Sequence, residues 1–88
     1  MTSRELLAKL KEKEKSIYSW YGKMYMNYLL ECIWNVVYSK ELSIENVREQ
    51  WRISYQNQIT TRNSGFDVKE EDLDLFREAM KDLESIEE

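Results

Sequence analysis

The feature that most constrains this chain is how rarely its backbone is interrupted: it contains no proline and only two glycines, Gly22 and Gly65. Proline and glycine are the residues that most often end a regular element. With so few breaks in 88 residues, the sequence predicts a few long elements. Apolar residues recur at three and four positions and no alternation with period two persists, so we expect these elements to be helices.

A first helix is predicted near the N-terminus. Thr2 is followed by Glu5, the arrangement of a capping box, in which each side chain accepts a hydrogen bond from the other residue's backbone N–H. The apolar stripe of this helix consists of Leu6, Leu7 and Leu10. At about 100° per residue, that stripe keeps phase with apolar residues as far as Cys32.

This continuity leaves open whether residues 3–39 form one helix or two. A single helix would be about 55 Å long at 1.5 Å per residue. The alternative places a turn in the polar run 11–16, with Ser16 as the N-cap of the second helix. A strand is an alternative for residues 33–38 only.

The segment 17–38 is apolar around most of its circumference. Its polar residues recur every four positions and form one narrow stripe of Lys23, Asn27, Glu31 and Asn35. Such a helix is expected to be surrounded by others, and a homodimer would cover it more completely than three partner helices. Because Tyr and Trp are enriched at interfaces, we predict a self-association or partner-binding aromatic face. Its residues are Trp20, Tyr21, Tyr25, Tyr28, Trp34 and Tyr38.

A further amphipathic helix is predicted after Ser43, which is a suitable N-cap. Its apolar face consists of Ile44, Val47, Trp51, Tyr55 and Ile59. The residues from 60 to 65 are predicted to form a loop in which Gly65 adopts a positive φ.

The last helix is predicted to begin with a second capping box, formed by Asp67 and Glu70. Its buried side consists of Leu73, Phe76, Met80 and Leu83. Phe66, just before it, is expected to return to the core. The predicted fold class is therefore all-α: residues 1–88 form a single domain, a compact bundle of three to four helices, with a long first helix and dimerisation left open.

The residue inventory argues against catalysis. Histidine is absent, which removes the imidazole general base, the Ser–His and Cys–His pairs and the His-ligated metal sites. The single cysteine, Cys32, falls on the apolar stripe, where burial keeps a thiol protonated and unreactive. No Gly-rich phosphate loop is present. We therefore expect no enzymatic activity, no metal and no cofactor.

Charge is segregated along the chain. The net charge is −4, yet residues 1–66 carry an excess of basic groups and residues 67–88 a large excess of acidic ones. On the last helix, Glu71, Asp74, Glu78 and Asp82 form an acidic column. We predict that this column docks on the basic, nucleic-acid-binding surface of a larger protein, as a mimic of nucleic acid that inhibits or regulates it.

In size and charge the chain is similar to the small acidic antagonists encoded by mobile elements, such as antitoxins, immunity proteins and inhibitors of defence proteins. This likeness implies an inhibitor that acts by binding. The expected location is cytoplasmic, because the N-terminus lacks the apolar region of a signal peptide and the lone cysteine has no partner. No membrane association is expected.

Two other functions are open. Arg48, Arg52 and Arg62 lie on a stretch rich in side chains that contact bases and phosphates, which favours a helix-turn-helix-like regulator that binds nucleic acid. Against this function, Glu45 and Glu49 lie three residues before two of these arginines and can pair with them on the helix. The pI near 4.9 also argues against nucleic-acid binding. The breadth of the aromatic face equally suits a structural subunit of a larger assembly.

Overall fold

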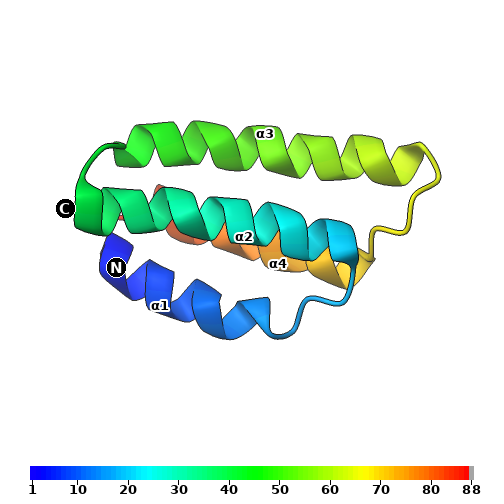
Figure 1. Cartoon of the computed structure of the whole chain (residues 1–88), viewed down its shortest axis with the longest axis horizontal. Helices are drawn as coiled ribbons and strands as arrows, with labels where there is room; N and C mark the ends of the chain where they lie inside the picture. The colour runs from blue at the N-terminus through cyan, green and yellow to red at the C-terminus, as the bar shows by residue number, and fades with distance from the viewer. Residues whose placement is uncertain (88) are drawn as a thin grey trace.

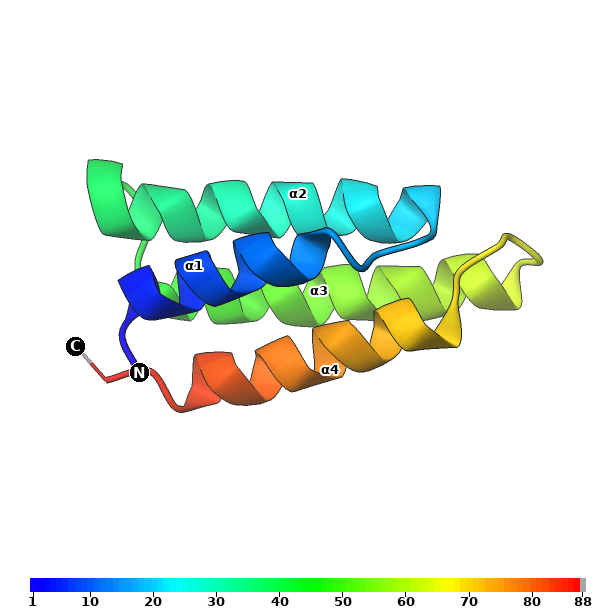
Figure 2. The same ribbon diagram turned by 90° about the horizontal axis from the view of Figure 1, so that it is seen from below.

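The computed structural model describes residues 1–87. Within them, the helices are α1 (Ser3–Glu14), α2 (Trp20–Trp34), α3 (Ile44–Asn63) and α4 (Glu70–Glu84), and a π-helical turn, η1 (Asn35–Ser39), extends α2. Successive helices alternate in direction, each packs against the next, and α1 closes the bundle against α4 (Figures 1 and 2). The predicted all-α bundle is confirmed.

The two ends of the described chain meet at one end of the bundle (Figure 1). There the backbone N–H of Glu87 donates to the carbonyl oxygen of Met1 at 3.3 Å. The predicted capping box of Thr2 and Glu5 is present and starts α1.

Residues 3–39 form two helices, so the single long helix is wrong. The predicted cap is also wrong, because Ser16 lies exposed in the turn and Ser19 is the N-cap of α2. Between them, Ile17 is buried in the core at 2% exposure. The chain leaves the helical path because this residue must reach the core while the polar run before it stays in solvent.

The start of α2 is held by a carboxylate from α4. Asp72 is fully buried. It accepts hydrogen bonds from the backbone N–H of Tyr18 at 3.2 Å, and from the N–H and hydroxyl of Ser19 at 2.9 and 2.6 Å. The Ser19 hydroxyl oxygen in turn accepts from the N–H of Gly22 at 2.9 Å. The first turn of α2 has no acidic residue of its own, so Asp72 supplies the negative charge that the positive end of the helix dipole favours.

The contact with Asp72 requires a residue without a side chain at position 22, where the glycine lies within a helix and not in a turn. A Cβ atom at this position would lie 2.8 Å from Asp72 Oδ2, from Ile17 Cγ2 and from Ser19 Oγ. A Cβ atom at these distances would force the neighbouring side chains to shift. The glycine therefore allows α2 to approach the carboxylate.

The helical segment that begins with α2 ends at Lys40, through the backbone conformation and a backbone hydrogen bond of this residue. Lys40 adopts a left-handed conformation (φ 59°), and its N–H donates to the Asn35 carbonyl oxygen at 2.6 Å. Ser43 then caps α3 as predicted, in a capping box with Asn46.

The junction of α3 and α4 differs from the prediction. Helix α3 continues to Asn63, because the Thr60 and Thr61 hydroxyls donate to carbonyl oxygens one turn back and remain compatible with a helix. Gly65 has the predicted positive φ, 96°.

The predicted capping box of Asp67 is wrong. Lys69 occupies the N-cap position of α4 without a side-chain cap, and Asp67 forms a salt bridge with Lys69 at 2.9 Å. Phe66 does not return to the core: it is 54% exposed and lies edge-on against Tyr21, whereas Val68 is buried.

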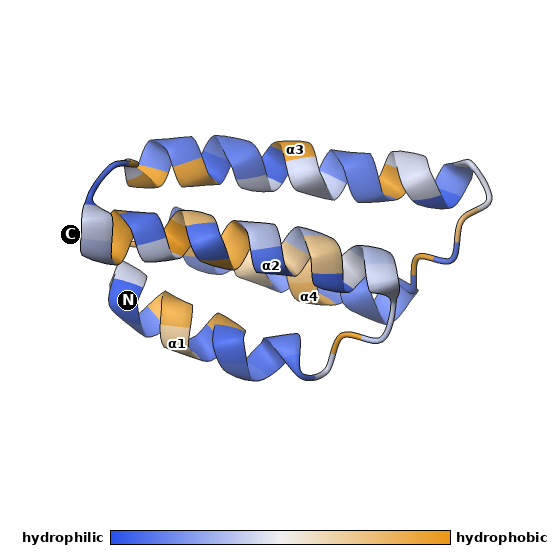
Figure 3. Cartoon of the chain, in the orientation of Figure 1, coloured by the Kyte–Doolittle hydropathy of each residue, from blue (hydrophilic) through white to orange (hydrophobic). Residues whose placement is uncertain are grey.

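The core is centred on Trp51 of α3. Its indole N–H donates to the Phe76 carbonyl oxygen at 3.2 Å, and the two rings lie 5.7 Å apart. Of the residues predicted for the buried side of α4, Leu73, Phe76 and Leu83 are buried and Met80 is partly buried. In Figure 3 the hydrophobic part of α1 lies beside α2, whereas its C-terminal half is polar.

We predict that Asp72→Ala lowers the free energy of unfolding by roughly 3 kcal/mol, because it leaves buried donors without an acceptor. Asp72→Asn keeps the shape but loses the charge and should cost less. Urea denaturation measures both. The exposed neighbour Glu71→Ala is the control and should change stability by less than about 0.5 kcal/mol. A loss as small for Asp72→Ala as for the control would contradict the anchoring role.

Gly22→Ala should also destabilise the fold, by roughly 1–3 kcal/mol, because the added methyl group overpacks the contact with Asp72. Helix propensity alone predicts the opposite sign, a gain of about 1 kcal/mol. Thermal unfolding decides between the two signs, with Gln56→Ala at an exposed position of α3 as the control.

Candidate binding surfaces

Of the nine large hydrophobic side chains that are exposed among the described residues, five lie on α2 or η1. The outer face of α2 carries four of these five. We define it as Trp20, Lys23, Met24, Asn27, Tyr28, Glu31 and Trp34, all of which are exposed. The exposed fraction is 69% for Trp20 and 47% for Trp34. Tyr38 in η1 extends the face and is 51% exposed. Large apolar side chains in contact with solvent over the length of one helix mark an interaction site more often than they mark a monomer surface.

This face is open because of how the bundle surrounds α2. Its opposite side is buried against the other helices through Met26, Leu29, Leu30 and Ile33. Helix α3 lies on one flank and α1 on the other (Figure 1), so the side away from the core has no neighbour in the described chain. Four of the six predicted aromatic residues, Trp20, Tyr28, Trp34 and Tyr38, are exposed, and Tyr21 and Tyr25 are half-buried.

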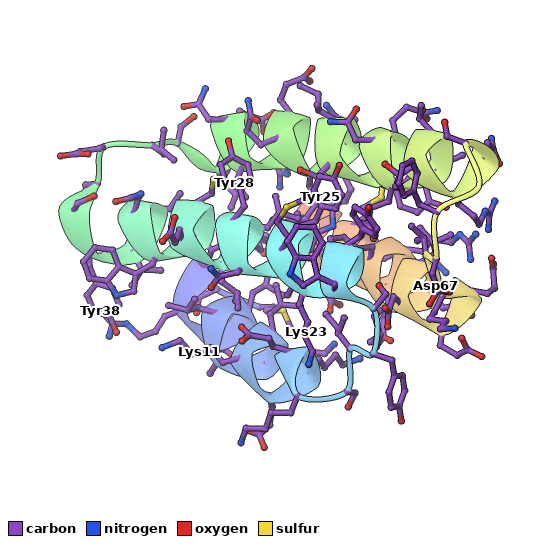
Figure 4. All side chains as sticks on the ribbon, turned by 45° about the vertical axis from the view of Figure 1, so that its right-hand side comes forward. Lys11, Lys23, Tyr25, Tyr28, Tyr38 and Asp67 are labelled. Atoms are coloured by element: carbon purple, nitrogen blue, oxygen red, sulfur yellow. The ribbon has the colours of Figure 1, made fainter. Side chains whose placement is uncertain are left out.

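The tyrosines at the edges of this face have partners in the chain. The Tyr28 hydroxyl donates to Gln50 Oε1 of α3 at 3.1 Å, and Figure 4 shows the ring directed toward α3. The Arg4 guanidinium lies over the Tyr38 ring, 5.1 Å from its centroid. The ring of Trp20 lies against that of Tyr21, and the ring of Trp34 lies against that of Tyr38. Both indoles keep a large exposed area.

Two open hollows lie where α1 meets this face. One, of about 590 Å³, is lined by Glu14, Lys15, Trp20, Lys23, Met24 and Asn27. The other, of about 310 Å³, is lined by Leu7, Lys11, Glu14, Asn27, Leu30, Glu31 and Trp34. Figure 4 shows Lys11 of α1 and Lys23 of α2 at this gap. The surface is thus a shallow groove with a tryptophan at each end.

The acidic column is largely used inside the bundle. Asp82 forms a salt bridge with Lys9 of α1 at 2.7 Å, and Glu78 forms one with Lys13 at 2.5 Å. Asp74 pairs with Arg77 on its own helix. Glu71 alone of the four forms no salt bridge with a described residue. The column therefore holds α1 against α4, and its charge is partly neutralised.

These pairs shift the titration of their members. The hydrogen bond from Lys13 lowers the pKa of Glu78 below its ordinary value of 4.5. The hydrogen bond to Asp82 raises the pKa of Lys9 above 10.5. Both directions favour the charged forms at neutral pH.

The arginines proposed for nucleic-acid contact also have partners in the chain. Arg48 donates to the Leu83 carbonyl oxygen through Nε at 3.0 Å and Nη2 at 2.9 Å, so it caps the C-terminal end of α4. Arg52 pairs with Glu49 at 2.9 Å and Arg62 with Glu70 at 2.5 Å. These side chains do not form a free basic row.

Cys32 is buried, as predicted. Burial raises the pKa of its thiol, which disfavours the reactive thiolate. It lies on the core side of α2 and takes no part in the outer face.

The polar stripe of α2 is part of this exposed face. Lys23, Asn27 and Glu31 belong to the predicted narrow stripe, which was not included in the predicted aromatic face. At about 100° per residue, however, Trp20 and Trp34 fall on the same side as this stripe. That angular match was available in the sequence and places the charges between the two tryptophans.

We predict that Glu78→Gln lowers stability at pH 7 by at most about 1 kcal/mol, because the side chain is 49% exposed and its ion pair is screened by solvent. The folded-state pKa is lowered, so the stabilisation is complete above pH 4.5 and is lost as the pH falls through that pKa. Urea unfolding at neutral and acidic pH should show the difference from the wild type disappear at acidic pH. Glu71→Gln is the control; a difference that persists in acid would contradict the ion pair's role.

The described residues contain no group of three or more His, Cys, Asp or Glu side chains placed to hold a metal ion. None of the described helices combines the length and apolar content needed to cross a bilayer. No family model matches the chain, and no curated protein or solved structure matches it at a significant level.

Proposed function

We propose that this protein is a non-catalytic protein-binding module that acts through the outer face of α2. The observation that carries the proposal is the exposure of Trp20 and Trp34 at the two ends of the α1–α2 groove. Two indoles in contact with solvent lower the solubility of the chain, whereas the third tryptophan, Trp51, is buried in the core. Contact with another protein removes that exposure.

The composition of the face suits an interface. Trp and Tyr are enriched among the residues that dominate binding energy, and Met adapts to the shape of a partner. Polar side chains between them supply direction and specificity. A single well-buried tryptophan contributes about 2 kcal/mol or more to such contacts.

The two other surfaces support binding less well. The acidic column pairs with Lys9 and Lys13, so a basic partner would have to compete with those contacts. The α3 arginines are held by α4 carbonyl oxygens and by carboxylates. We therefore retain the expectation of a protein that binds and regulates a partner. We propose that the contact surface is the outer face of α2 and not the acidic column of α4.

The test is site-specific photo-cross-linking in the native host, with p-benzoylphenylalanine at Trp20 or Trp34. Ile53 of α3, 44% exposed, is the matched control position. Both α2 positions should link the chain to one defined protein species, several-fold more efficiently than position 53. Excess wild-type chain should compete, whereas the Trp20→Ser, Trp34→Ser double variant should not. Circular dichroism checks that this variant is folded.

A third probe position, Glu71, tests the acidic helix. Cross-links from position 71 with none from positions 20 and 34 would refute the α2 surface in favour of α4. Equal yields from all positions, or none from α2, would likewise rule out the proposal.

A further inference from the structure

Five exposed residues of α2 are arranged symmetrically about Asn27, the central one, whereas Met24 and Tyr28 have the buried Leu30 and Met26 at their mirror positions. Lys23 lies four residues before it and Glu31 four residues after it. Trp20 lies seven residues before it and Trp34 seven after it. All five side chains are exposed on one side of the helix, over about 21 Å at 1.5 Å per residue.

We infer that the partner of the α2 outer face is a second copy of this chain, packed with its α2 antiparallel and with the two-fold axis at Asn27. The inference rests on the proposed function, which identifies this face as the contact surface. A two-fold axis at Asn27 places each residue opposite the one equally far on the other side. Lys23 then meets Glu31 of the other copy, Trp20 meets Trp34, and the two Asn27 side chains meet each other.

Each of these pairs is favourable. Lys23 and Glu31 form two symmetric ion pairs across the interface. The indoles form two aromatic pairs at its ends, where ring contacts add to the area they bury. The Asn27 amides each carry donors and an acceptor, so they bond each other at the axis, and a central Asn is a device that fixes the register of paired helices.

The two charges are available for this contact. Neither Lys23 nor Glu31 has an opposite charge three or four residues away on α2. Neither forms a salt bridge with a described residue, although Glu14 and Lys11 of α1 line the adjoining hollows. In the dimer, Lys23 and Glu31 of each copy face the opposite charges of the other copy.

Other pairings of the same face are unfavourable. A parallel pair would place Lys23 against Lys23 and Glu31 against Glu31. An antiparallel pair shifted by one turn would place Lys23 or Glu31 opposite Asn27 and break both ion pairs, and a shift of two turns would place one of the two charges opposite its own copy. The charge pattern therefore selects the antiparallel register at Asn27.

The test is the oligomeric state by sedimentation equilibrium of the full chain. The wild type should be a dimer, and Lys23→Glu or Glu31→Lys should each raise the dimer Kd at least tenfold. Lys40→Glu and Glu41→Lys make the same charge changes at exposed positions beyond η1 and should shift the Kd less than about twofold. An equimolar mixture of Lys23→Glu and Glu31→Lys chains should restore wild-type affinity as a heterodimer.

The outcomes separate the alternatives. A parallel dimer would be insensitive to each single reversal, because a like-charge pair would remain a like-charge pair, and this result would overturn the inference. A wild-type chain that is monomeric at its highest soluble concentration would also overturn it. In that case cross-links from Trp20 and Trp34 to a different protein would leave the proposed function standing, whereas their absence would remove both.

Discussion

The fold depends on one buried polar contact, the carboxylate of Asp72 at the N-terminus of α2. It accepts from the backbone of the α1–α2 link and from the N-cap Ser19, and Gly22 gives it room. Because Asp72 belongs to α4, the contact joins the start of one helix to the start of another that lies far away in sequence. It stabilises the break between α1 and α2 and holds the start of α2 against α4. The side of α2 away from the core carries the two tryptophans.

The charges of the chain divide between structure and surface. The lysines of α1 pair with the acids of α4, and the arginines of α3 bond the carboxylates and last carbonyl oxygens around α4. These contacts hold the helices that frame α2. Lys23 and Glu31 remain outside that network, in the middle of an aromatic face. The acidic segment gives the sequence its charge asymmetry, and its carboxylates Asp82 and Glu78 pair with lysines of α1. For this reason we propose the α2 face, and not the acidic helix, as the surface that binds a partner.

Much of the local structure could be predicted from the sequence. The caps at Thr2 and Ser43, the positive φ of Gly65 and the burial of Cys32 depend on residues close together in the chain or on a single helical periodicity. The errors have a common cause. Ser16 and Asp67 are good capping residues in isolation. Ser19 is the N-cap of α2 instead of Ser16, because Asp72 of α4 bonds Ser19. Asp67 does not cap α4 and forms a salt bridge with Lys69. Phe66 is exposed, and Val68 is the residue of this link that is buried.

The sequence by itself determined that the chain is helical, where α1 and α3 begin, that the chain turns at Gly65, and that α2 has more apolar surface than a small bundle covers. These properties follow from periodicity and from hydrogen bonds between near neighbours. Only the tertiary structure decided which aromatic residues are exposed, which acids are neutralised and which charges stay unpaired. Those outcomes depend on contacts between side chains of different helices. Local sequence patterns do not specify which helices pack together, so they do not specify these contacts.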